Sequence, residues 1–153
     1  TLRTEITEGD FAGSNIAGWG YLGWDTANNS TARAVDRFWR TSAGANLRYQ
    51  SWDVIAAFIY GKDNNWDLAT NKEQTSKGIT GQVGYLLSEK WFAAMQYDWL
   101  NGTDGSQNFN KVTPVMTFMP RQNMRFDTGG RIDLNQTGGG RQHEAFVNIR
   151  TMF

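Results

Sequence analysis

Hydrophobic and polar residues alternate along most of this chain with a period of two. In the segment 90–100, one side carries Trp91, Ala93, Met95, Tyr97 and Trp99, and the other includes Ala94, Gln96 and Asp98. Successive side chains of a strand point to opposite faces, so this pattern predicts a strand with one apolar and one polar face. No segment sustains the 3.6-residue period of a helix. The same reasoning predicts an all-β chain of about nine strands, at 1–8, 13–25, 37–50, 52–63, 77–88, 90–100, 109–121, 122–133 and 141–153.

The connections between these predicted strands alternate in length. Short turns are expected near Gln50–Ser51, Ser88–Glu89 and Arg121–Gln122, with a slightly longer one around 9–13. Long polar loops are expected at 25–36, 63–76, 101–108 and 134–140. An antiparallel up-and-down meander with tight turns at one end and long loops at the other is typical of a transmembrane β-barrel of the outer-membrane type.

Aromatic residues recur at a spacing that suits such a barrel. Trp91 and Trp99 are eight residues apart on one face, and so are Trp52 and Tyr60. Eight strand residues at ~3.3 Å each and a tilt of ~40° rise roughly 20 Å, close to the ~25 Å apolar band that aromatic girdles flank. We therefore predict two girdles in contact with membrane lipid, one near each end of the strands. Their predicted members are Trp24, Tyr49, Trp52, Tyr60, Trp91, Trp99 and Phe153.

The opposite face of the predicted strands is rich in charged side chains. In a barrel these residues would face the lumen, and the predicted lumenal charges are Arg40, Arg48, Asp98, Arg125, Asp127, Arg131, Asp133, Glu144 and Arg150. The arginines would set a positive field where anions pass, or would pair with the carboxylates and hold the interior together. Both readings stay open. A soluble β-sandwich or lipocalin-like barrel would also place charges on one face, so these residues do not separate the two fold classes.

The last residues carry a resemblance to a known class. The run HEAFVNIRTMF, residues 143–153, resembles the closing strand of bacterial outer-membrane barrels, which alternates apolar residues and ends on Phe. It departs from that pattern at Thr151. The stretches GANLRYQSWDVIAAFIYGKDNN and VTPVMTFMPRQNMRFDTGGRID resemble the C-terminal strands of larger porins. The resemblance implies an outer-membrane location, with the long loops outside and the short turns at the periplasmic rim. It implies passive permeation or a scaffold role, and it carries over no catalytic residue.

Composition narrows the function classes. A length of 153 residues suits one domain. Aromatics make up 14% of residues although the mean hydropathy is −0.57, a combination that favours β structure with turns. The chain has no cysteine, one histidine (His143), and 15 basic against 15 acidic residues. The chain therefore lacks the residues for a thiolate or histidine metal cluster, and we expect no cofactor. The balanced charge gives no electrostatic reason for a nucleic-acid partner. No enzymatic site is recognisable in the sequence.

Two questions stay open at this point. Barrels of one bacterial chain normally have even strand numbers, so nine strands predict either a portion of a larger barrel or a small eight-stranded barrel with a tail. The function is expected to be a porin-like channel for ions and small polar solutes. The alternatives are a structural barrel that sheathes or binds a partner, such as an outer-membrane cytochrome conduit, and an eight-stranded barrel without an open pore. A homo-oligomer is compatible with each of them.

Overall fold

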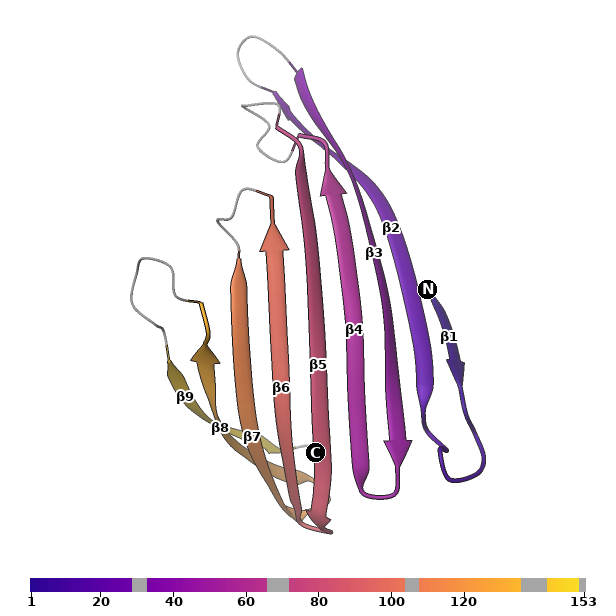
Figure 1. Ribbon diagram of the computed structural model, residues 1–153, viewed down its shortest axis with the longest axis vertical. Coiled ribbons are helices and arrows are strands. Elements are labelled where there is room, and N and C mark those ends of the chain that lie inside the picture. Colours follow the sequence, from indigo (N-terminus) through magenta and orange to yellow (C-terminus); the bar gives the residue numbers. More distant parts are fainter. Residues whose placement is uncertain (29–32, 66–71, 104–107, 136–142, 152–153) are drawn as a thin grey trace.

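The computed structural model describes residues 1–28, 33–65, 72–103, 108–135 and 143–151. All regular structure in these ranges is β-strand, and the strands run in chain order across one sheet (Figure 1). Their bounds are β1 Leu2–Glu5, β2 Asn15–Asn28, β3 Arg33–Tyr49, β4 Trp52–Asp63, β5 Gln74–Ser88, β6 Trp91–Gly102, β7 Phe109–Arg121, β8 Met124–Asp133 and β9 Glu144–Thr151.

Consecutive strands pair antiparallel throughout, from β1–β2 to β8–β9. The predicted all-β, antiparallel up-and-down arrangement is therefore confirmed. The predicted closure is not, because β1 and β9 lie at the two edges of the sheet and do not pair with each other. The described strands form an open nine-stranded sheet, in which Leu2–Glu5 is a paired strand and not the tail of an eight-stranded barrel.

The predicted loop at 25–36 is wrong in its bounds. The ladder between β2 and β3 continues past the apolar part of both strands, with Asp25 opposite Asp36 and Asn28 opposite Arg33. Antiparallel pairing satisfies backbone groups whatever the side chains are, so polar residues extend a ladder that is already aligned. For the same reason β5 begins inside the predicted 63–76 loop and β6 ends inside the predicted 101–108 loop. Most of the predicted loop at 134–140 lies outside the described residues.

The short connections lie together at one end of the sheet. The turns between β3 and β4, β5 and β6, and β7 and β8 are at the lower end in Figure 1, and the strand ends that border the long connections are at the upper end. We call these the turn end and the loop end. Each of these three turns has two residues between its strands, and in the β3–β4 turn Gln50 adopts a left-handed φ of 52°. From β3 onward the predicted alternation of short and long connections is confirmed, but the β1–β2 connection has nine residues and the β2–β3 connection only four.

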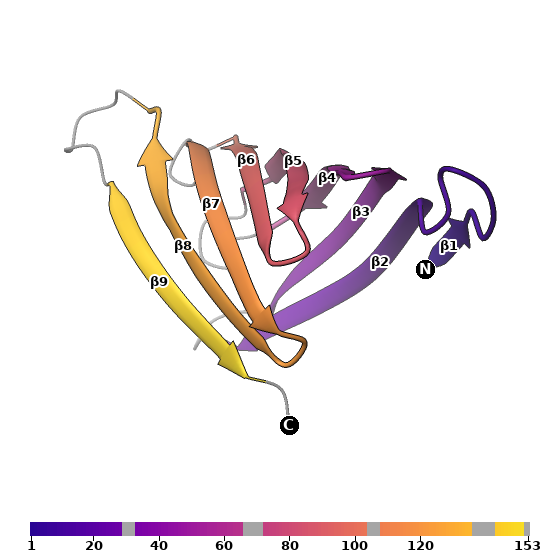
Figure 2. The ribbon, with the colours of Figure 1, turned by 90° about the horizontal axis from the view of Figure 1, so that it is seen from below.

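The two faces of the sheet differ sharply in polarity. The sheet is strongly curved (Figure 2), and no hydrophobic side chain in its described residues is buried. Apart from glycines, the buried strand residues are polar and share one face, as the strand register shows; they are Asp36, Gln74, Thr113, Thr117 and Asp127. The opposite face carries most of the exposed large hydrophobic side chains, including Leu22 at 81% and Val147 at 72% exposure. We call these the polar face and the apolar face.

Three phenylalanines on the polar face lie over glycines of neighbouring strands. A Cβ built on Gly23 would be 2.5 Å from the Phe38 ring, and a Cβ built on Gly129 would be 2.7 Å from the Phe146 ring. Phe92 covers Gly84 in the same way. An aromatic ring that covers a strand glycine supplies the contact that the missing side chain does not. These rings therefore occupy the space above the glycines, where a side chain of the neighbouring strand would otherwise lie.

Candidate functional site

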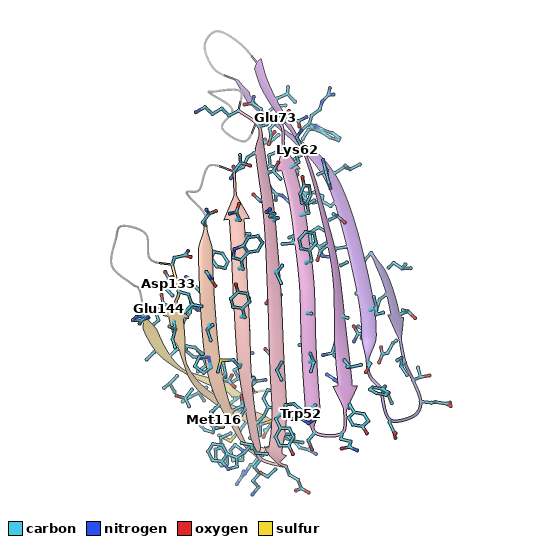
Figure 3. The ribbon with its side chains drawn as sticks, viewed as in Figure 1. Trp52, Lys62, Glu73, Met116, Asp133 and Glu144 are labelled. Atoms are coloured by element: carbon cyan, nitrogen blue, oxygen red, sulfur yellow. The ribbon has the colours of Figure 1, made fainter. Side chains whose placement is uncertain are left out.

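The polar face is the candidate functional surface, because the strand register brings the predicted charges together there. All nine fall on this face, including the cross-strand partners Arg125 and Arg150, and Arg131 and Glu144. Figure 3 marks Asp133 and Glu144 close to each other at the loop ends of β8 and β9. Their role as lumenal charges stays a prediction.

The densest polar cluster is centred on Asp127, a carboxylate that is only 3% exposed. Its Oδ1 accepts a hydrogen bond of 2.6 Å from the Thr117 hydroxyl and one of 2.7 Å from Arg125 Nε. Arg150 Nε lies 3.9 Å from Oδ2. Arg125 and Arg150 are directly opposite on adjacent strands and would repel each other. The negative charge of Asp127 offsets this repulsion.

The other arginines of the set also have carboxylate partners. Arg131 Nη1 is 2.9 Å from Glu144 Oε2. Arg40 and Arg48 form longer contacts of 3.4 Å, with Asp63 and Asp53 respectively. Every predicted lumenal arginine thus has an acidic neighbour within ion-pair distance. This geometry favours the interpretation in which charge pairs organise the face over the one in which the arginines create a uniform positive field.

The two remaining carboxylates of the set, Asp98 and Asp133, accept hydrogen bonds from uncharged donors. Asp98 accepts a hydrogen bond of 2.6 Å from the Thr80 hydroxyl and further ones from the Gln96 amide, and Lys111 is its cross-strand partner. Asp133 accepts from the backbone N–H of Asn135 at 2.9 Å. The polar face therefore combines charged, amide and hydroxyl groups.

A hollow of about 520 Å³ opens on the polar face at the loop end of β2 to β6. Polar side chains on its wall include Asp36, Arg40 and Asp63, and apolar ones include Ile59 and Leu100. Among the described residues, no three His, Cys, Asp or Glu side chains gather in a way that could hold a metal ion. The hollow suits small polar solutes and water.

The predicted girdle residues fall on the apolar face. In the register Tyr49, Trp52 and Trp91 lie at the turn end, and Trp24, Tyr60 and Trp99 lie toward the loop end. Figure 3 marks Trp52 at the turn end. Phe153 lies outside the described residues. No helix in the described ranges is long and apolar enough to cross a membrane.

Sequence reasoning missed several members of these aromatic rows. Tyr85 packs on Trp52 with ring centroids 4.6 Å apart, and Phe118 packs on Trp91 at the same distance. Phe126 continues that row at 6.3 Å from Phe118. At the loop end Trp39 packs on Tyr60 at 5.2 Å. Each residue stood on the apolar face of its own strand pattern, but only the register shows that these rings are neighbours.

Comparisons with protein-family models, with characterised proteins and with solved structures found no match to this chain. The porin class predicted from the sequence therefore stays a prediction, and any function rests on the geometry of the two faces.

Proposed function

We propose that this chain forms part of the wall of an outer-membrane β-barrel and that its polar face lines a passage for ions and small polar solutes. The observation that supports this proposal is the inverted distribution of polarity. Buried strand side chains are polar, and large hydrophobic side chains are exposed on one continuous face.

A lipid environment accounts for that inversion. Monomeric soluble proteins rarely expose a contiguous apolar patch larger than a few hundred Å². Here the apolar face extends across the strands, and Trp24, Val147 and Ile149 are each at least 65% exposed. Aromatic rows near the two strand ends, with small and aliphatic residues between them, match the lipid-facing band of outer-membrane barrels.

The polar face has the properties of a solute passage. Ion pairs such as Arg40–Asp63 and Arg131–Glu144 are partly exposed, so their remaining hydrogen-bonding groups are available to water and solutes. Because each predicted lumenal arginine has a carboxylate neighbour, we expect the passage to discriminate only weakly between anions and cations.

The membrane part of the proposal is tested by refolding. The chain, diluted from urea into buffer, into detergent micelles and into lipid vesicles, should develop β-sheet circular dichroism and protease resistance only with detergent or lipid. A protease-resistant monomer in plain buffer would contradict the proposal.

The passage is tested in planar bilayers that contain the chain. We expect stepwise conductance and a reversal potential close to zero under a salt gradient. A strong anion preference that disappears in Arg131→Ala would instead favour the positive-field interpretation. The absence of conductance from an inserted chain would exclude a passage formed by this chain alone and leave the membrane role intact.

A further inference from the structure

The apolar face carries an asymmetric set of charges. Among the strand residues whose side chains the structure describes, this face has no carboxylate and four cations, as its register shows. Three of the four lie at the loop end on adjacent strands: Arg37 on β3, Lys62 on β4 and Lys77 on β5. The fourth, Arg121, is the last residue of β7 at the turn end. A one-sided cluster of this kind attracts anions.

The three loop-end cations are interleaved with aromatic residues. Lys62 pairs across strands with Trp39, Lys77 with Tyr60, and Arg37 with Trp24. Lys77 Nζ lies 5.8 Å from the centre of the Trp99 ring. The cations therefore border the apolar band directly, with polar strand ends beyond them.

Within the described part of the chain, two of these cations lack a carboxylate partner. Lys62 Nζ is 3.0 Å from Glu73 Oε2, and Figure 3 marks both residues at the loop end. Arg37 and Lys77 form no ion pair with a described residue, and Arg37 is exposed. Glu73 neutralises at most one of the three charges, so the cluster keeps a net positive charge among the described residues.

A hollow of about 550 Å³ lies beside Arg37. Leu22, Trp24, Val35 and Trp39 line it from the apolar face. A guanidinium at the rim of an apolar hollow is complementary to a molecule with an anionic head and a hydrocarbon tail. A free inorganic anion would gain nothing from the apolar wall.

We propose that the loop end of the apolar face binds anionic lipids through Arg37, Lys62 and Lys77, and that the acyl chain of the lipid at Arg37 lies against the hollow. This proposal rests on the membrane-facing role of the apolar face proposed above. Basic residues near an anionic membrane surface each contribute about 1 kcal/mol of attraction, roughly a fivefold change in binding. Arg37 and Lys77 should contribute most, because Glu73 already partners Lys62.

The experiment uses the intact chain in mixed vesicles of phosphatidylglycerol and phosphatidylcholine, with one lipid brominated at a time. Bromine quenches tryptophan fluorescence on contact, so the two series give the relative binding of the two headgroups. We expect the chain to favour phosphatidylglycerol by at least about fivefold, and Arg37→Gln or Lys77→Gln to reduce that preference by about fivefold each. Lys62→Gln should reduce it less. Lys111→Gln, a cation on the polar face near the same end, is the matched control and should leave the preference unchanged.

The outcomes separate the two proposals. Equal quenching by both lipids in the unmodified chain would overturn the headgroup site but keep the membrane-facing role. Quenching by neither lipid would overturn both. If Lys111→Gln reduced the preference as much as Arg37→Gln, the assignment to this cluster would be wrong. If inorganic phosphate displaced the lipid at a similar concentration, the proposed contact of the acyl chain with the hollow would be wrong.

Discussion

The two faces of the sheet are built from alternate residues of the same strands, yet they differ in polarity and in which side chains are exposed. On β4, Val54, Ala56 and Phe58 belong to the apolar face, whereas Asp53 and Asp63 belong to the polar face and form ion pairs. The apolar face has aromatic rows near the strand ends and exposed hydrophobic side chains throughout. The polar face has charge pairs and buried carboxylates.

This difference implies that the solvent around a face, and not the exposure of a side chain, decides how much a substitution changes the free energy of unfolding. In a soluble protein an exposed position tolerates charge, and a buried one does not. If the apolar face meets lipid, its most exposed positions become the least tolerant of charge, while half-buried positions on the other face accept it.

The sharpest test places the same charge on either side of one strand. Val83 lies on the apolar face in the middle of β5 and is 47% exposed. We expect Val83→Arg to lower the free energy of unfolding by about 2–4 kcal/mol, which is the cost of placing a cation near the bilayer midplane. Gln82→Arg, the neighbouring residue on the polar face, should cost less than about 1 kcal/mol. Urea titrations in lipid vesicles measure both. Equal costs would mean that the two faces do not meet different environments.

Removing the central carboxylate of the polar face should have the next largest effect. Asp127→Asn leaves Arg125 and Arg150 opposite each other without a counter-charge, and we expect a loss of about 1–3 kcal/mol in the free energy of unfolding. Glu144→Gln breaks an ion pair that is about half exposed, and should cost at most about 1 kcal/mol.

The same titrations include a compensating variant. Asp127→Asn combined with Arg150→Gln removes the repulsion as well as the carboxylate, so it should recover part of the loss. If the double variant were less stable than Asp127→Asn, like-charge repulsion would not be the cause.

Substitutions in the aromatic rows should give the smallest coupling energies, and only between rings that are in contact. In a double-mutant cycle with Trp91→Leu and Phe118→Leu, we expect a coupling of about 0.5–1.5 kcal/mol, because the rings pack at 4.6 Å. Trp91→Leu and Trp99→Leu lie eight residues apart on the same strand and should be additive within about 0.5 kcal/mol. Coupling between the distant pair, or none between the close pair, would contradict the row assignment.

Much of the fold could be predicted from the sequence because strand alternation is a local property. The order of strands, the positions of the short turns and the face of every predicted charge follow from a period of two and from the turn residues. The strand bounds at Asp25–Asp36 could not be predicted in this way, since a paired ladder extends through polar residues that resemble a loop in isolation. The neighbours of Asp127 and of Trp91 were likewise inaccessible, because cross-strand contacts depend on register.

The alternation in the sequence is enough to say which side chains of a strand share a face, because each residue's side is set by its position in that strand. Only the tertiary structure decided that Arg125 and Arg150 share one carboxylate and that Arg37, Lys62 and Lys77 gather at one end of the apolar face. It also decided that the described strands form an open sheet, with β1 and β9 at its edges. Register, curvature and closure depend on hydrogen bonds between strands, which alternation within a single strand does not encode.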